Sequence, residues 1–542
     1  MQMFTPNSTI IGCSVPLTMG DRKQVDFSSL TAQHDYFFGL RKLTWDNYNY
    51  QRKDHSIVVS GNVDSLSAVN YVMYRNANFT QADGNYKWFY AFVTAREWVS
   101  ENAARLYLKT DVFQTWLFDM DLHPSMVVRE HTPTDGYYEH TLAENLELGE
   151  PIEINRIRAT TYSMSGVTAA SFDANYRCVV CCSELWRANI RPTSLLGGLP
   201  RAAYYYGFSR AQLPYAIADM VDTNGAESII CVYAVPIGAL NWEEYNVDGF
   251  TYYVPSDKAD PDTREILIPP RAEPYRMGTI KNKKCFSYPY HYYVLHDYAG
   301  HSVTLAPQNF LDANQGSFKV KTYFNGATNP AALTVPLNYL NMGIAAQSEG
   351  DASIDYSVCY DSFPELAYST DFFKNYLALN SAKLSVNSAA IAMQAMFSTT
   401  HGLSEALSGL NPVVSTAANL VDMQKVPDRV NGNIGGNLHL KAGNAGIYIS
   451  EYRLKDEYMS FIDRYFTMYG YKVMTMKLPQ FNTRKLFNYI QTSGIDLSGQ
   501  GNVSIPQTDL DELASMFNQG LTVWHISKGA TFGSYSGDNS PG

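Results

Sequence analysis

A chain of 542 residues is long enough for about two to four domains with large hydrophobic cores. Its net charge of −11 at pH 7 excludes a body that grips nucleic acid through basic patches, although nucleic acid could slide past such a surface. Only 17% of the residues are charged, whereas 40 are Tyr and 26 are Phe. This balance favours strands and wide contact surfaces, so we expect an obligate oligomer.

Residues 1–20 lack the basic region and the long apolar region of a secretory signal, because Pro6 and Pro16 interrupt them. We therefore expect the protein to be made and kept in the cytoplasm first. The seven cysteines are an odd, scattered set that does not indicate a disulfide framework. Cys178, Cys181 and Cys182 have no second pair of ligands that would complete a zinc site, so we expect buried strand thiols.

Most of the chain before the apolar segment described below is predicted to be β structure. Residues 87–93 and 103–112 predict a hairpin that turns at 100–102, and its second half alternates apolar and polar side chains as a half-buried strand does. Further short strands are predicted between Gly, Pro, Asn and Asp clusters at residues 57–59, 177–182, 229–235 and 287–295. This spacing is typical of sandwiches and barrels, so the expected fold class is mainly β with some α.

Residues 384–421 form an apolar segment in which Glu405 is the only fixed charge. Its first half, residues 384–400, would span about 25 Å as a helix, less than a bilayer core of about 30 Å. Asn411-Pro412 interrupts the second half, so the segment predicts a hairpin of two short helices rather than a membrane anchor. The residues expected to plug a lumen or enter a membrane are Leu384, Val386, Ile391, Met393, Met396, Phe397, Leu403, Leu407, Leu410, Val413, Val414, Leu420 and Val421.

Glycine-rich polar sequence follows this segment directly and predicts hinges that would let it leave the body. Apolar runs of this length also occur in soluble proteins, so a buried core hairpin or a coiled-coil-like contact between subunits remains an alternative. The expected hinge residues are Gly432, Gly435, Gly436, Gly443 and Gly446.

Two helices and two strands are predicted after the hinges. Apolar residues from Leu454 to Tyr469 lie on one helical face, including Tyr458 and Phe461, and Gly470 stands where a helix cap belongs. Residues 472–478 predict a strand. A second helix is expected from a capping box at Thr508 and Asp511 to just before Gly520, followed by a strand at 521–526 and a flexible tail at 529–542.

No motif indicates an enzyme. The glycine clusters lack the Lys and Ser/Thr of a phosphate loop, and no nucleophile elbow or zinc-protease motif is present. The odd spacing of His291, His296 and His301 alternates strand faces and argues against a shared metal site. Asp119 and Asp121 are more typical of a solvated strand end than of a catalytic pair. We therefore expect no catalytic residues, no metal and no cofactor.

Several short strings, in conserved order along nearly the whole chain, resemble the distal tail knob protein of small short-tailed bacteriophages of the phi-twenty-nine type. Aromatic residues dominate them, and the strings near the two ends are the most specific. They are 88–94 (WFYAFVT), 111–116 (DVFQTW), 118–119 (FD), 129–131 (REH), 288–290 (YPY), 469–472 (YGYK), 483–485 (TRK), 487–489 (FNY), 491–492 (QT), 520–522 (GLT) and 524–525 (WH).

The resemblance implies six subunits that form a hollow β-barrel tube at the tail tip. Long apolar loops would plug the lumen and later emerge to form a channel through which the genome enters a Gram-positive cell. The segment at 384–421 matches those loops in position and amphiphilic character, but it is richer in Ala and Ser where the family is richer in Gly. Within the strings, Arg129, Glu130 and Arg484 are expected to pack and pair inside the tube wall.

The resemblance also implies the partners and the location of the protein. The expected partners are identical subunits in a hexamer, the proximal tail tube or collar, the tail-tip protein, the host cytoplasmic membrane, and viral DNA that passes through without specific binding. The expected location is the distal end of the virion tail, after assembly in the host cytoplasm. The expected segments are a β-barrel tube domain (1–134), a poorly matched middle β region (135–285), a second β region (286–377), the apolar loop with its hinges (378–447), a helix and strand part of the wall (448–528) and the tail (529–542).

Two hypotheses from other functional classes remain open at this point. A cell-wall-degrading tail-tip protein would need a carboxylate or metal constellation, and a receptor-binding adhesin would need a cleft in which sugars stack on aromatic rings. For a conduit, the acidic balance of the chain further predicts a lumen with net negative charge, because repulsion keeps DNA moving.

Overall fold

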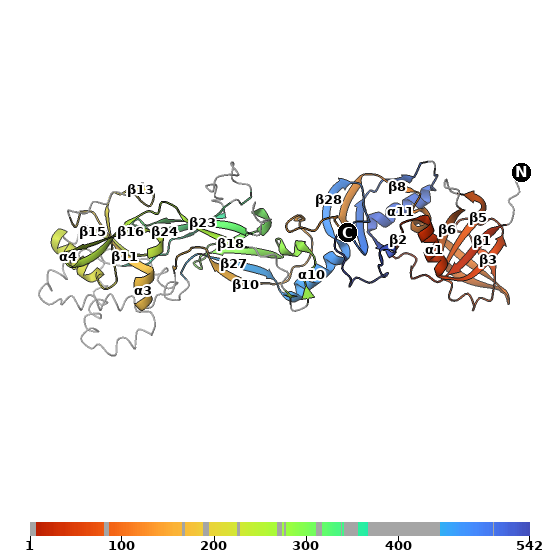
Figure 1. Cartoon of the computed structure of the whole chain (residues 1–542), viewed down its shortest axis with the longest axis horizontal. Helices are drawn as coiled ribbons and strands as arrows, with labels where there is room; N and C mark the ends of the chain where they lie inside the picture. Colours follow the sequence, from red (N-terminus) through yellow and green to blue (C-terminus); the bar gives the residue numbers. More distant parts are fainter. Residues whose placement is uncertain are drawn as a thin grey trace, which may run out of the picture. The chain divides into compact units, whose positions relative to one another are not determined.

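The computed structural model of the chain is mainly β, with several antiparallel sheets and a few helices (Figure 1). It falls into two compact units. Unit 1 comprises residues 1–147, 273–285 and 456–542, and unit 2 comprises 148–272 and 286–455. The structure describes residues 7–80, 86–164, 169–187, 195–224, 228–267, 274–275, 278–310, 317–337, 339–340, 356–366, 445–501 and 503–542.

The first sheet of unit 1 is six-stranded and antiparallel, in the order β3-β1-β5-β6-β7-β4. The predicted hairpin is confirmed, since β6 and β7 pair and the chain turns at residues 101–102. In β7 the buried residues alternate with more exposed ones, as the sequence pattern predicts. The bounds are β1 (Ser8–Cys13), β3 (Arg41–Tyr48), β4 (Ile57–Ser60), β5 (Tyr71–Thr80), β6 (Tyr86–Ser100) and β7 (Ala103–Thr110), with α1 (Leu30–Gly39) immediately before β3.

The second sheet of unit 1 joins the two ends of the chain, in the order β2-β31-β29-β9-β28. Its β2 runs parallel to β31, and the other neighbours are antiparallel. One hydrophobic core contains Phe37 and Phe113 from the first part of the chain together with Phe487, Phe517 and Trp524 from the last part. The bounds are β2 (Lys23–Asp26), α2 (Val112–Trp116), β8 (Met120–Leu122), β9 (Ser125–Glu130), α10 (Asp456–Tyr469), β28 (Tyr471–Lys477), β29 (Phe487–Ser493), β30 (Leu497–Gly499), α11 (Gln507–Gln519) and β31 (Leu521–His525).

The buried face of α10 differs from the predicted one. Met459, Ile462, Asp463 and Phe466 are buried, whereas 76% of the Phe461 side chain surface is exposed. The cause is Asp463, whose carboxylate accepts hydrogen bonds from the backbone of residues 281–282 and so turns a polar residue inward. The predicted end of this helix is correct, because Gly470 follows it with a φ of 63°.

Two predictions of local structure, at the start of α11 and at the start of β21, are wrong in detail. The capping box is absent, because Pro506 precedes α11 and Thr508 lies within its first turn. The strand expected from residue 287 begins at His291, after a turn that contains Pro289, which has no N–H for a ladder.

Residues 529–542 pack against β29 instead of forming the flexible tail that the sequence suggested. Tyr535 contacts the rings of Phe487 and Trp524. Asn539 accepts hydrogen bonds from the backbone N–H groups of Leu486 and Phe487 and donates to the Phe487 carbonyl. Polar composition alone did not reveal these contacts, because they depend on partners in β29 and β31 that are distant from the segment in sequence.

The described residues of unit 2 form three larger antiparallel sheets and two short helices. The strand orders are β10-β27-β21-β22, β16-β17-β14-β11-β15-β26 and β18-β23-β24-β25. The bounds in these sheets are β10 (Pro151–Arg158), β11 (Tyr176–Cys182), β14 (Tyr204–Phe208), β15 (Ile229–Pro236), β16 (Asn241–Val247), β17 (Phe250–Ser256), β18 (Asp262–Leu267), β21 (His291–His296), β22 (Ser302–Leu305), β23 (Ser317–Asn325), β24 (Ala331–Pro336), β25 (Val358–Tyr360), β26 (Glu365–Leu366) and β27 (Tyr448–Leu454).

Small elements complete the chain, and the helices of unit 2 lie beside its six-stranded sheet (Figure 1). Two-residue strands form the pairs β12 (Leu195–Leu196) with β13 (Leu199–Pro200), and β19 (Pro274–Tyr275) with β20 (Gly278–Thr279). The helices are α3 (Ala169–Asn175) and α4 (Leu213–Asn224), and the 3-10 turns are η2 (Ile237–Ala239), η3 (Lys283–Phe286), η4 (Pro307–Asn309) and η8 (Ile526–Lys528).

Candidate functional site

The predicted membrane-active segment belongs to one long insertion in unit 2. The insertion follows β26 and precedes β27, and its residues 367–444 lie outside the described part of the chain. All thirteen plug residues named from the sequence, and the hinge residues Gly432, Gly435, Gly436 and Gly443, therefore lie outside the described residues.

Gly446, the last predicted hinge, is described. Its φ is 135°, and a Cβ at this position would meet the side chains of Tyr448 and Met164 at 3.3 and 3.4 Å. Its neighbours Ala445 and Ile447 are buried. Glycine is therefore required here by the backbone conformation, and the packed body of unit 2 resumes at this point.

The strand that follows the insertion is held on both sides. β27 pairs with β10 and with β21, and Arg453 is aligned with Ile152 and His291. The buried Glu451 carboxylate lies 2.7 Å from His291 Nε2, and Ser450 Oγ lies 2.8 Å from His296 Nε2. The insertion is thus followed by a central strand of its sheet.

The candidate metal and catalytic residues do not come together. His291, His296 and His301 contact different partners, and the partner of His301 is the Asp297 carboxylate at 2.7 Å. Asp119 forms an ion pair with Lys87 and does not form a carboxylate pair with Asp121. Within the described residues, no group of three His, Cys, Asp or Glu side chains has the arrangement of a metal site.

The cysteines of β11 are buried strand thiols, as predicted. Cys178, Cys181 and Cys182 are free and at most 1% exposed. Burial raises the pKa of the Cys182 thiol to about 12, so this group is a poor nucleophile.

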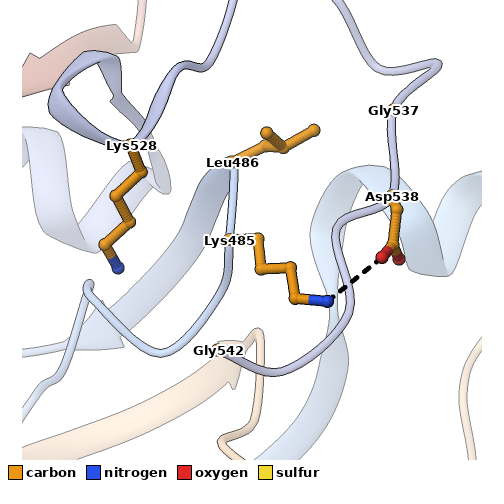
Figure 2. A pocket seen from close by; sticks show the side chains of 6 residues that line it. All are labelled: Lys485, Leu486, Lys528, Gly537, Asp538 and Gly542. Carbon is orange, nitrogen blue, oxygen red and sulfur yellow. Dashed lines mark hydrogen bonds and ion pairs between the residues drawn. The ribbon is translucent and has the colours of Figure 1, made fainter.

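The described part of unit 1 contains an open depression of about 630 Å³ between the C-terminal residues and the start of β29. Figure 2 shows Lys485 and Lys528 from separate segments beside it, with Lys485 Nζ 3.2 Å from the Asp538 carboxylate. Lys528 donates to the Arg484 carbonyl at 3.2 Å. Leu486 and two glycines complete the lining, so these residues supply no nucleophile with an adjacent base.

Residues of the string at 111–116 form a buried hydrogen-bond network, which explains why polar residues occur in this string. Asp111 caps α2 by accepting the Gln114 N–H at 3.1 Å, and it accepts the Tyr71 hydroxyl at 2.9 Å. The Gln114 side chain donates to Gln24 and to the Val25 carbonyl in β2. Burial raises the pKa of Asp111 to about 6, although these hydrogen bonds oppose the rise. This network joins the two sheets of unit 1.

A second buried cluster centres on Glu144, which the sequence did not single out. The Arg129 guanidinium and the Lys284 ammonium both donate to its carboxylate, and the Lys472 N–H donates at 2.9 Å. Burial raises the pKa of Glu144, but the Lys284 hydrogen bond and charge, with Lys472 and Arg129, outweigh it and hold the pKa below its usual value. One carboxylate, two cationic side chains and one backbone N–H therefore form this cluster.

His131, from the string at 129–131, is a structural residue. Its Nδ1 accepts the Tyr489 N–H at 2.7 Å, and its Nε2 lies 3.1 Å from the Thr467 carbonyl. Burial, with the charge of Arg484 nearby, lowers the pKa of His131 to about 3. The ring is thus neutral at pH 7. Its N–H is on Nε2, where it can donate a hydrogen bond to the Thr467 carbonyl.

Comparison with known proteins identifies the family in which these sequence strings occur. A model described as the C-terminal domain of the Bacillus phage phi29 tail knob protein gp9 matches residues 257–540, more than half of the chain. The chain belongs to this family of phage tail knob proteins. A second model, the N-terminus of the caudoviral major tail protein, matches residues 8–121. The resemblance deduced from the strings is therefore confirmed, and the protein is a viral tail component of the phi29 type.

Individual relatives support the assignment over the full length. The chain is 25% identical to the tail knob protein gp9 of Bacillus phage phi29, with 95% of both chains covered. It is also 25% identical to the tail knob protein gp9 of Bacillus phage PZA, again over 95% of both. The solved structure of the bacteriophage C1 tail knob protein gp12 matches with a TM-score of 0.64 at 13% identity, covering 98% of each chain, which shows a shared fold.

Proposed function

We propose that this tail knob protein forms a ring at the distal end of a short phage tail and that the genome leaves through its lumen. Six copies are expected from the family resemblance, with other tail proteins above and below the ring. Large aromatic side chains that remain exposed on the described chain, among them Trp98, Phe461 and Tyr86, support assembly, because a soluble monomer seldom leaves many such groups in water.

Residues 384–421 are proposed to plug the lumen and, after release, to enter the host cytoplasmic membrane. The observation that supports this most strongly is the combination of family membership with an apolar segment inserted between two strands of unit 2. Among the described residues, no helix combines the length and the apolar character needed to cross a bilayer.

The proposed role is structural and needs no catalysis. Several side chains that were considered as catalytic or metal residues have structural partners, such as Lys87 for Asp119 and Glu451 for His291. DNA would pass without specific binding, and the acidic balance of the chain suits a lumen with net negative charge.

Deletion of residues 384–421 tests the proposal. The parent protein should give a particle near six subunit masses by light scattering and should release dye from liposomes. The deletion should assemble in the same way but release no dye. If the deletion variant releases dye as well as the parent does, another part of the chain acts on the membrane; if it no longer assembles, the segment is a subunit contact.

A further inference from the structure

Strand β28 is an edge strand of unit 1 with an apolar outer surface. It pairs with β9 on one side, and no described strand pairs with its other side. Met474, Met476 and Leu478 are exposed in or just after this strand, and 64% of the Met476 side chain surface is open. A free edge with exposed apolar side chains is a template for pairing with another chain.

The backbone of β28 is strained at the same place. Its register with β9 shifts between Lys472 and Thr475, which marks a bulge, and Met474 has a φ of 47°. A long side chain in the left-handed region is uncommon and costs free energy, and such strain concentrates at functional surfaces. Beyond the bulge, residues 475–477 form a short regular segment whose outer edge can accept a partner.

Two edge strands of unit 2 carry charged residues along their length. The edge strand β10 displays Glu153 and Arg156 as an ion pair, and the edge strand β18 displays Arg264 and Glu265 beside its end. Charges on an edge discourage pairing between molecules. In β28 the residues between Lys472 and Lys477 are all uncharged. Lys472, Lys477 and the bulge are themselves protective features, so the part of this edge that lacks a charge is residues 473–476.

The outer half of β6 offers a second open edge on the same chain. Its pairing with β5 stops where Phe92 meets Tyr71, and its residues 94–100 pair only with β7 among the described strands. These residues are exposed, and 61% of the Trp98 side chain surface is open. The free part of β6 and the whole of β28 are both seven residues long.

The two edges are chemically complementary. An antiparallel alignment that puts Trp98 opposite Met476 also puts Glu97 opposite Lys477. It brings Glu101, at the hairpin turn, beside Lys472. Sulfur against an aromatic ring and opposite charges across a ladder are both favourable. Glu97 already pairs with Arg105 and Lys477 with Glu130, so the contact would extend two existing ion pairs. The regular segment 475–477 would face residues 97–99, so the bulge lies outside the ladder.

We propose that β28 of one copy pairs with the outer half of β6 of the next copy, in the alignment just described. The inference rests on the proposed function, since it names the contact that builds the ring. The two halves of the contact differ, so the interface is heterologous, and repetition of a heterologous contact with a fixed rotation closes a ring. The occupant of each edge is therefore a second copy of this chain.

A cysteine pair tests this contact directly. In a Cys359→Ser background, which removes the one exposed cysteine of the described residues, Trp98→Cys and Met476→Cys are combined in the full chain. Mild oxidation, or a short bismaleimide, should then give a ladder from dimer to complete ring on a non-reducing gel. Each single variant should run as a monomer on this gel, because the alignment never brings two identical positions together and so no cross-link can form. The matched control combines Trp98→Cys with Leu267→Cys, an equally exposed position in unit 2, and should give no ladder.

Light scattering of the uncrosslinked parent separates the two levels of the proposal. If the parent assembles but the 98/476 pair gives no ladder, or the control pair gives an equal one, the contact is wrong while the ring stands. If the parent is a monomer at all concentrations up to the micromolar range, both the ring and the contact are wrong. As a second measurement, Met476→Asp should weaken assembly at least tenfold, and Leu267→Asp should leave it unchanged. Equal assembly of both variants would overturn the contact.

Discussion

The backbone of Gly470 lies directly against the backbone of Glu130: a Cβ at residue 470 would stand 2.0 Å from the Glu130 carbonyl oxygen. Gly470 ends α10 with a φ of 63° and leads into β28, which pairs with β9 at Glu130. Glycine is therefore needed at position 470 for two physical reasons: the positive φ and the close approach of the Glu130 backbone.

Gly470→Ala should destabilise unit 1 by more than about 2 kcal/mol, because the left-handed conformation alone costs an alanine about 1 to 2 kcal/mol and the backbone overlap adds to it. Gly501→Ala is the matched control, since Gly501 has a φ of 59° with nothing near its Cβ position. Urea unfolding of the two variants should show the larger midpoint shift for Gly470→Ala. Equal shifts would mean that the close approach to the Glu130 backbone does not contribute to the loss of stability.

Asp111 should make unit 1 more stable in mild acid than at neutral pH, as far as this group alone is concerned. Its pKa is raised by burial from 3.8 to about 6, so the folded state binds the proton more tightly than the unfolded chain does. The stabilisation is complete below about pH 4 and is lost as the pH rises through about 6.

Asp111→Asn keeps the acceptor for the Gln114 N–H and removes the buried charge. It should therefore be tolerated at pH 7, and the dependence of stability on pH between 4 and 6 should become flatter. Asp111→Ala removes the cap and leaves the Tyr71 hydroxyl without its acceptor, which should cost about 1 to 3 kcal/mol. Unfolding midpoints from pH 4 to 7 check both, and an Asn variant as unstable as the Ala variant would contradict the assignment.

Glu144 should be the least replaceable member of its cluster. Glu144→Gln leaves the buried Arg129 and Lys284 cations without a counter-charge, a situation that typically costs about 3 to 5 kcal/mol. Lys284→Met should cost less, because Arg129 still pairs with the carboxylate. Thermal unfolding at pH 7 should rank the variants in this order, and the reverse ranking would show that Lys284 holds the cluster.

The same cluster should contribute to loss of stability in acid. The pKa of Glu144 lies below its usual value of 4.5, so its stabilisation is present above about pH 4.5 and is lost as the pH falls through the folded-state value. Unfolding midpoints of Glu144→Gln should therefore fall less steeply than those of the parent below pH 4.5. An unchanged slope would assign acid sensitivity to other carboxylates.

The sequence predicted those elements whose pattern is local. The β6 and β7 hairpin follows from alternation, and the end of α10 follows from Gly470, because each depends on neighbouring residues. The inward turn of Asp463 depends on backbone groups about 180 positions away. The cluster at Glu144 likewise joins residues from four separate segments, which no local pattern reveals.

The candidate site shows the same limit. The apolar character of residues 384–421 and their place between β26 and β27 could be predicted from composition and family resemblance. The two edges of the proposed contact could not, because exposure of Met476 and Trp98 depends on which strands stand beside β28 and β6. From the sequence alone, Met476 is placed in a predicted strand at 472–478, and Trp98 lies outside the strand predicted at 87–93.

Ile391→Asp combined with Phe397→Asp should block the membrane step and leave assembly intact. Each aspartate near the centre of a short membrane helix costs about 2.5 to 3.5 kcal/mol of insertion free energy, so the pair should abolish dye release from liposomes. The segment is proposed to lie in the lumen and not in the β core, so the variant should still give particles of the parent mass.

Acidic buffer is the condition to compare with neutral buffer, because protonation of Glu405 lowers the cost of its burial. Ile391→Leu with Phe397→Leu is the matched control and should release dye like the parent. If the double aspartate variant fails to assemble, or releases dye as the parent does, residues 384–421 are core or subunit contact and the channel proposal is wrong.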